Sequence, residues 1–374
     1  MNATTGHAIE LDDWDQATEA HMSTVIVPAL LALSEHARAS GPDLIDSYLA
    51  GLEVAMRFGE AINPGHLYRG WHPTSTIGAL GGAAVCSRLL RLDARATANA
   101  ISMATTNAGL KCQAGTLAKA LHAGFAAQCA VQCTLLAEIG VEAAHDAFEG
   151  RIGVEVLRST PDALGFAAAA KRLVAGSAVT QYGVVRKVYP TCGIMHRPMD
   201  GISALMAEHR LGLDEIESVT VIGSRPEFEH LRCHNPTDVS EARFCVEFGA
   251  AIALAFGQVT LAHVSQETLS DAHYQKAFAK VRVETYEPEN IVSGGTNYPP
   301  VKLRLVTTDG KRHSSSIEYA RGWPEQPLTV SEVTEKFMSC VTPRLGEERA
   351  QRLLSTINSL ATLESSASIL RQCV

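Results

Sequence analysis

Acidic and imidazole side chains crowd a short segment near the start of the chain. Residues 7–14 read HAIELDDW, so the carboxylates of Glu10, Asp12 and Asp13 fall within four positions, and His21 follows closely. An imidazole titrates near neutral pH and needs little tuning to carry a proton. A neighbouring carboxylate can orient such a ring, so the segment is a candidate for general acid–base chemistry. Ordinary solvated capping residues would explain the aspartates about equally well.

Three other segments place imidazole or ammonium groups at the ends of expected helices. His72 stands directly before a proline and an expected helix start, where free N–H groups favour an anion. Lys119 and His122 lie one turn apart on a helix of small residues, and the apolar run around them argues for burial near a pocket. Lys187 leads to His196, where helical sequence gives way to another pattern. Each residue, taken alone, also fits a helix cap or a solvated surface group.

The first half of the chain must position most of these side chains on helices. Apolar residues at helical spacing, rich in Ala and Leu, predict helices over residues 25–35, 44–58, 75–92, 94–109 and 117–138. The small residues of Gly78–Gly82 predict close helix packing. A glycine-rich nucleotide loop is the alternative for this stretch, but no strand is expected ahead of it.

From about residue 184 the pattern becomes that of strands. Alternating residues predict strands over 216–222, 281–285 and 301–307, and Asp309-Gly310 predicts a hairpin turn into 314–319. Further helices are expected over 198–209, 242–255, 271–280, 331–338 and 347–360. The expected fold is mainly α with a smaller α+β domain. Residues 1–182 and 321–374 form a large helical domain from both chain ends, residues 183–320 form an inserted α+β lid, and a cleft lies between them.

Composition restricts the partners. The formal net charge of −8, with no basic stripe to offset it, argues against nucleic acid. The nine cysteines form no CxxC and no zinc-spaced cluster, which fits reduced thiols and no metal site. No apolar run approaches the ~20 residues of a bilayer span, and the N-terminus lacks a signal-peptide pattern. We therefore expect a cytoplasmic protein that binds neither membrane nor nucleic acid.

Six segments together resemble one family. They read GHAIELDDW, GWHPTSTIGALGGAA, GTLAKALHAGFAAQ, FEGRIG, RKVYPTCGIMH and RGWPEQPLT, and they run in order along essentially the whole chain. These segments are similar to those of the MmgE/PrpD family, which includes 2-methylcitrate dehydratase, cis-aconitate decarboxylase and iminodisuccinate epimerase. The resemblance implies an active site between a helical domain and an α+β lid, no cofactor, and a homodimer.

The resemblance also implies site residues. His21, His72, Lys119 and Lys187 match family motifs, and Glu10 stands where relatives carry an aspartate. A proton removed beside a carboxylate leaves negative charge, which fixed cations and donors must stabilise. We expect Lys119, Lys187 and His72 to hold the substrate's carboxylates. His21 would move the proton.

Other residues complete the expected site. Glu10 or Asp13 would orient His21, and His122 and His196 would assist in binding the substrate. Dehydration of a small polycarboxylate is favoured, as the family's commonest named activity; decarboxylation and epimerisation are the alternatives within the family.

Three departures from the family pattern bear on this expectation. Relatives carry further helices ahead of the His7 segment, so the helical domain is expected to lack them. Phe248 stands where relatives often have a tyrosine. His21 is followed by Met22 instead of the common proline, and the preceding loop is one residue longer than in the decarboxylase. These features leave a non-catalytic binding or assembly subunit as an alternative function, and the glycine stretch leaves a nucleotide-dependent enzyme as another.

Overall fold

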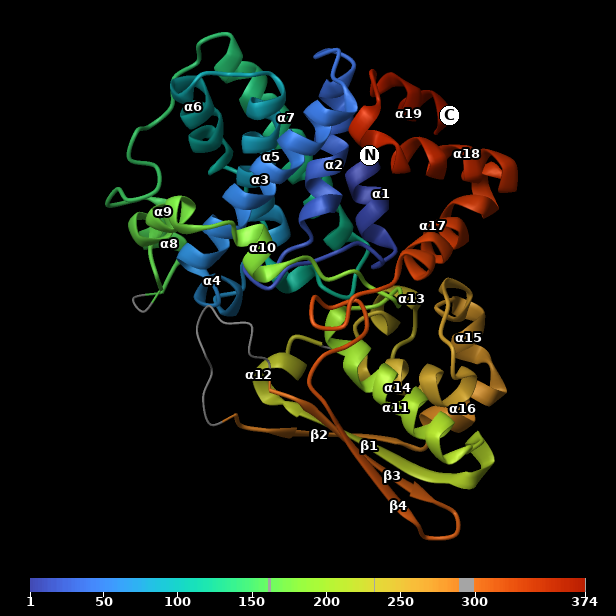
Figure 1. Cartoon of the computed structure of the whole chain (residues 1–374). Helices are drawn as coiled ribbons and strands as arrows, with labels where there is room; N and C mark the ends of the chain where they lie inside the picture. The colour runs from blue at the N-terminus through green and yellow to red at the C-terminus, as the bar shows by residue number, and fades with distance from the viewer. Residues whose placement is uncertain (161–162, 232, 289–298, 374) are drawn as a thin grey trace.

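Two large hydrophobic cores and one small cluster organise the chain in a computed structural model, which describes residues 1–160, 163–231, 233–288 and 299–373. Figure 1 shows a helical bundle in its upper part and a sheet with covering helices in its lower part. The first core lies in the bundle and the second lies between the sheet and its helices. Mainly helical structure with a small sheet confirms the expected fold class; the domain boundaries after residues 182 and 320 stay a prediction.

The bundle is built from the first half of the chain. Its helices are α1 (Asn2–Ala8), α2 (Met22–Ser34), α3 (Gly41–Ile62), α4 (Gly65–Tyr68), α5 (Pro73–Leu89), α6 (Ala94–Ala104), α7 (Ala118–Glu138), α8 (Val154–Arg158), α9 (Phe166–Ala175) and α10 (Ala178–Tyr182). Helix α5 is central and packs against α2, α3, α6 and α7.

Glycines allow α5 to approach its neighbours closely. A Cβ added to Gly81 would lie 2.7 Å from the Cβ of Ala55, and one added to Gly82 would lie 2.7 Å from the Cβ of Ala130. The run Gly78–Gly82 therefore serves helix packing, as expected. Because it lies inside α5 and not between a strand and a helix, the nucleotide-loop hypothesis is wrong.

The end of the chain returns to the bundle. Helices α17 (Val330–Leu345), α18 (Glu347–Asn358) and α19 (Ala367–Gln372) follow the sheet. Leu353 and Ile369 are buried in the first core. The backbone N–H of Gly41 donates to the carbonyl of Leu363 at 2.7 Å, which fixes this return at the start of α3.

The lower part contains the sheet and its helices. The elements are α11 (His196–His209), β1 (Ile216–Ser224), α12 (Arg225–Phe228), α13 (Val239–Ala242), α14 (Val246–Phe256), α15 (Gln266–Ser270), α16 (Ala272–Phe278), β2 (Val281–Tyr286), β3 (Val301–Thr307) and β4 (Arg312–Ile317). The strand order is β2-β1-β3-β4. Strand β1 pairs parallel with β2 and antiparallel with β3, and Gly310, at φ +83°, turns β3 into β4 as predicted.

Buried and more exposed residues alternate along the strands, so one face of the sheet is covered by helices. Val219 and Val221 of β1 and Leu303 and Leu305 of β3 are buried, while the residues between them are more exposed. Helices α11 and α14 pack on the sheet (Figure 1). The second core lies between them.

Two expected helices differ from the structure. The helix expected over 94–109 ends at Ala104, and Asn107 instead donates to the backbone carbonyl of Ser75 at 2.9 Å. The helix expected over 242–255 is broken between α13 and α14, which leaves Arg243 outside both helices. Both breaks occur beside the candidate site.

Helix α7 is long and apolar. Within the described ranges it is the one helix whose length and composition would allow a membrane crossing. Half of its apolar stretch is buried inside the protein, and the helix packs against α1, α5 and α6. The core helix of a globular protein has the same properties.

Candidate active site

The loop between α1 and α2 carries most of the acidic residues, and distant parts of the chain hold it in place. Trp14 forms an antiparallel β-bridge with Val185, in which the backbone N–H of Trp14 donates to the carbonyl of Val185 at 3.1 Å. Arg243 donates from Nη1 to the carbonyl of Ala8 at 2.7 Å. Lys336 of α17 donates from Nζ to the carbonyl of Leu11 at 2.9 Å. These contacts make the loop a fixed part of the structure.

Glu10 joins two lysines from different parts of the sequence. Its Oε1 accepts from Lys119 Nζ, and its Oε2 lies 3.0 Å from Lys187 Nζ. All three side chains are buried, at 3%, 6% and 0% exposure respectively. Burial opposes ionisation of Glu10, but the two ammonium charges outweigh it and hold its pKa well below the ordinary value. Burial likewise opposes the charge of Lys187, yet Glu10 and Asp12 raise its pKa.

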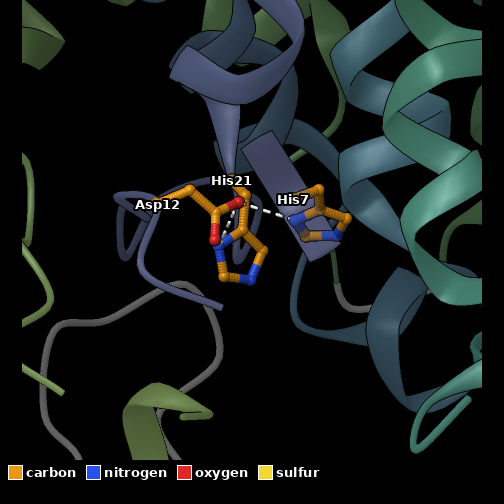
Figure 2. A group of neighbouring side chains, drawn as sticks. All are labelled: His7, Asp12 and His21. Atoms are coloured by element: carbon orange, nitrogen blue, oxygen red, sulfur yellow. Dashed lines mark hydrogen bonds and ion pairs between the residues drawn. The ribbon is translucent and has the colours of Figure 1, made fainter. Parts of the chain in front are cut away.

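His7, Asp12 and His21 form a second cluster, shown in Figure 2. Asp12 Oδ2 lies 2.6 Å from His7 Nδ1 and 3.4 Å from His21 Nδ1. Burial disfavours the Asp12 carboxylate, but His21, His7 and Lys187 together keep its pKa well below the ordinary value. Asp12 therefore stays ionised between two imidazoles.

The hydrogen bonds of His21 fix its tautomer. Its Nδ1 lies 2.8 Å from the backbone carbonyl of Asp13, and a carbonyl can only accept, so Nδ1 carries the proton. Burial lowers the pKa of His21, so the ring is neutral and Nε2 holds a lone pair. His21 lines the cleft. The ring is therefore poised as a general base, oriented by Asp13 and Asp12.

A pair of histidines lies beside this base. His72 Nδ1 and His122 Nδ1 are 2.8 Å apart, so the two nitrogens share one proton between them. Burial, followed by the charge of Lys119, lowers the pKa of His72, and burial also lowers that of His122. The His7 ring lies 5.9 Å from His72 and 4.8 Å from His21, centroid to centroid, and so connects both clusters.

Two helix N-termini meet at this point. His21 is the N-cap of α2 and His72 is the N-cap of α5. The backbone N–H of His21 donates to Thr74 Oγ1 at 3.1 Å, which ties the two ends together. The positive ends of both helix dipoles favour an anion between them, although the Ser23 N–H already donates to Asp13 Oδ1 and the Ser75 and Thr76 N–H groups donate to the His72 carbonyl.

A cleft connects these groups with the lower part of the molecule. It has a volume of about 180 Å³. Residues of the helical bundle and of the lower part line it, including Glu10, His21, His72, Lys119, His122 and Phe244. Lys119 Nζ lies 5.0 Å from the centre of the Phe244 ring. Five of the eight expected site residues thus line one cleft: Glu10, His21, His72, Lys119 and His122.

Three expected site residues lie behind the cleft wall. The ammonium of Lys187 lies behind Glu10 and supports that carboxylate. Asp13 accepts at its carboxylate from the hydroxyl of Ser23, and burial raises its pKa to about 6; only its carbonyl reaches His21. His196 is buried edge-to-face against Tyr189, with ring centres 5.1 Å apart, and burial lowers its pKa to about 3.

Several supporting residues had little or no signal in the sequence. Asp12 and His7 stood in the acidic segment, and their spacing could have marked them. Lys336 also donates to the carbonyl of Lys187 at 2.8 Å, so it joins both segments that carry the buried charges. No local pattern marks Lys336, because its partners are 149 and 325 residues away.

Two observations bear on metals and on the tyrosine position. His7, Asp12 and His21 present ligand atoms within 4.8 Å of one another. The Nδ1 atoms of His7 and His21 already form hydrogen bonds, and Lys187 Nζ lies 3.8 Å from Asp12 Oδ1, so a cation would meet an ammonium group. The arrangement fits a hydrogen-bonded relay better than a metal site.

Phe248 packs against Tyr274 in the second core, with ring centres 5.5 Å apart.

Comparisons with known proteins agree with the resemblance. The chain is 26% identical to cis-aconitate decarboxylase of Homo sapiens over 380 residues, 97% of this chain and 76% of that protein. It is 26% identical to cis-aconitate decarboxylase of Aspergillus terreus over 382 residues, 97% of this chain and 78% of that protein. It is 25% identical to the cis-aconitate decarboxylase-like protein oryM of Aspergillus oryzae over 394 residues, 99% of this chain and 80% of that protein.

Two family domains cover most of the sequence. Residues 1–167 match the MmgE/PrpD N-terminal domain, and residues 189–362 match the MmgE/PrpD C-terminal domain. The chain belongs to the MmgE/PrpD family.

Proposed function

We propose that this protein is a lyase that acts on a small polycarboxylic acid by moving a proton at the carbon beside a carboxylate, without a cofactor. One observation carries the proposal: His21 donates from Nδ1 to the Asp13 carbonyl at 2.8 Å, which leaves Nε2 as a base in a cleft that Lys119 also lines. A positioned base of this kind contributes ~10²–10⁴-fold to the rate.

The neighbouring groups suit the charge that such a step creates. When His21 takes the proton, the electron pair of the C–H bond moves toward the adjacent carboxylate. Lys119, which lines the cleft, and the positive end of the α5 dipole can stabilise that charge, and one fixed donor contributes about 3 kcal/mol in comparable sites. In a dehydration, the electron pair then forms a C=C bond, the C–O bond breaks, and the hydroxyl leaves as water with the proton that His21 took from the carbon. The neutral base therefore favours dehydration as the first candidate.

Decarboxylation is the second candidate, because the relatives named above are cis-aconitate decarboxylases. In that reaction the C–C bond to the carboxylate breaks, CO2 leaves, and the electron pair accepts a proton at carbon. For this step His21, which is neutral in the free protein, must first take up a proton at Nε2. The same residues serve both reactions, and the product distinguishes them.

Proton exchange in deuterated water tests the proposal. Purified protein is incubated with citrate-like acids, unsaturated tricarboxylates and iminodiacids, and NMR follows deuterium, water loss and CO2 release. We expect deuterium at one carbon beside a carboxylate, and a loss of at least a hundredfold in the His21→Asn variant. The exposed His36→Asn variant is the matched control. No exchange with any acid, or full activity without His21, would refute the proposal and favour a non-catalytic subunit.

We also propose a homodimer. Exposed apolar side chains lie along and beside α7, in one group at its start and another at its end: Leu117, Leu121, Phe125, Leu136 and Ile139. Large apolar side chains exposed near both ends of one helix favour burial against a partner. Sedimentation at micromolar concentration should give twice the chain mass, and a monomer would contradict this.

The cysteines, all free in the described residues, fit a cytoplasmic protein.

A further inference from the structure

The cleft has a second end, built by the turn that precedes His21. Asp15 accepts at its carboxylate from the Thr18 N–H at 2.8 Å and from the Thr18 hydroxyl at 2.5 Å. The backbone N–H of Glu19 donates to the Asp15 carbonyl at 3.0 Å. The turn places Glu19 in the left-handed region, with φ +52°. Gln16 and Glu19, both from this turn, line the cleft.

Buried amide groups at this end have atoms without partners. Gln16 is 7% exposed, and neither Nε2 nor Oε1 has a hydrogen-bond partner among the described residues. Asn63 is 5% exposed and lines the same cleft, and its Oδ1 likewise has no partner in that part of the chain. Asn63 Nδ2 donates to the carbonyl of Thr18 at 2.6 Å, so the amide is held against the turn. Buried polar atoms are normally paired, so these atoms indicate a bound group.

The charged groups here differ from those at the Lys119 end. Two carboxyl groups, those of Glu19 and Glu227, line this part of the cleft, and Glu227 is ion-paired with buried Arg197. Burial raises the pKa of Glu19 to about 8, against the charge of Lys111 and with the support of Asp15 and Glu227. Glu19 is therefore mostly uncharged at neutral pH. A carboxylate placed here would face these two carboxyl groups as well as the ammonium group of Lys111, which lines the same cleft.

We propose that this end of the cleft binds an uncharged group that both donates and accepts hydrogen bonds, a carboxamide or a hydroxyl, and that Gln16, Glu19 and Asn63 recognise it. The inference rests on the proposed function, because the carboxylate of the same substrate would bind at Lys119. The substrate class is then a small acid with a carboxylate at one end and a neutral polar group at the other.

A carboxamide can pair with two of the three unpaired atoms, Gln16 Nε2 and Asn63 Oδ1. Its carbonyl accepts from Gln16 Nε2. Its NH2 group donates to Asn63 Oδ1 and to the Glu19 carboxyl group. A carboxylate offers no donor, and so it would leave Asn63 Oδ1 unpaired.

Two unreactive probes of equal size test this specificity. Propane-1,2,3-tricarboxylate and its terminal monoamide are titrated calorimetrically into the intact protein at pH 7. We expect the monoamide to bind about tenfold more tightly. Gln16→Leu, which keeps the volume, should weaken binding of the monoamide about three- to tenfold, because the amide carbonyl loses the Nε2 donor.

The pH dependence gives a second measurement. As the pH rises through about 8, Glu19 ionises, and its negative charge should weaken binding of the tricarboxylate. Glu19→Gln should remove that decrease, while Lys111, Asp15, Glu227 and Tyr68, which surround Glu19, stay unchanged.

Lys119→Met separates this inference from the proposed function. If that variant binds neither probe, the result supports a carboxylate site at Lys119. Equal affinity for the two probes, a preference for the tricarboxylate, or binding of neither would overturn the specificity inference. Full binding of both probes without Lys119 would instead overturn the proposed function.

Discussion

Replacing Glu10 by Gln should destabilise this protein strongly. The carboxylate lies between two buried ammonium groups, with Lys187 Nζ at 3.0 Å and Lys119 bound to the other oxygen. Gln has nearly the same volume but no charge, so the substitution leaves both lysines uncompensated. Removing one partner of a buried ion pair costs about 3–5 kcal/mol. The free energy of unfolding at pH 7 should fall by about that amount.

The size of this effect should depend on pH. The pKa of Glu10 in the folded protein is lowered, so its contribution is present above the unfolded value of about 4.3 and is lost as the pH falls through the folded value. The difference between wild type and Glu10→Gln should therefore be full at pH 7 and should disappear at strongly acid pH.

Chemical denaturation of four proteins tests this reasoning. Glu10→Asp keeps the charge and is the matched control. The double variant Glu10→Gln with Lys187→Met removes one of the two uncompensated charges and should recover part of the lost stability. A Glu10→Gln protein as stable as wild type at pH 7, or a double variant less stable than the single one, would refute the proposed charge balance.

Three further changes have expected outcomes. His21→Asn keeps a donor for the Asp13 carbonyl but removes Nε2, so kcat should fall ~10²–10⁴-fold with little change in KM; equal kcat would contradict the assignment. Lys336→Met leaves two backbone carbonyls unpaired, so it should lower stability by about 1–3 kcal/mol and lower kcat, whereas exposed Glu335→Gln should do neither. Burial raises the pKa of Asp13 to about 6, so its contribution to stability is present at low pH and is lost as the pH rises through 6; Asp13→Asn should remove that decrease in denaturation curves.

Local periodicity accounts for what could be predicted from the sequence. The helices that carry His72, Lys119 and His122 were expected because apolar spacing depends on a few neighbouring residues. The hairpin at Asp309-Gly310 was expected for the same reason, since its turn requires a positive φ that glycine provides. Convergence of the histidines and of Lys119 on one cleft followed from the family resemblance and not from spacing.

Long-range contacts account for what could not be predicted. Lys187 looked like a substrate-binding lysine, but whether an ammonium faces a cleft or a buried carboxylate depends on packing between segments 177 residues apart. Arg243 stood inside an expected helix, yet the chain breaks there and the side chain holds the carbonyl of Ala8 at 2.7 Å. Lys336 contributes from the last part of the chain for the same kind of reason.

The neutral histidine pair implies that binding a polycarboxylate takes up protons. Only one proton lies between the Nδ1 atoms of His72 and His122, and burial together with Lys119 lowers the pKa of both rings. A bound carboxylate adds negative charge beside them and should raise those pKa values.

Calorimetry in two buffers of different ionisation enthalpy measures this uptake. Titration with propane-1,2,3-tricarboxylate at pH 7 should show a net uptake of up to about one proton for each ligand bound. Affinity should then decrease as the pH rises, because the free rings must still gain the proton. His122→Asn should reduce the uptake, whereas the exposed His36→Asn should not. Binding with equal enthalpy in both buffers would show that the pair stays neutral, and the anion would then be held by Lys119 and the helix N-termini alone.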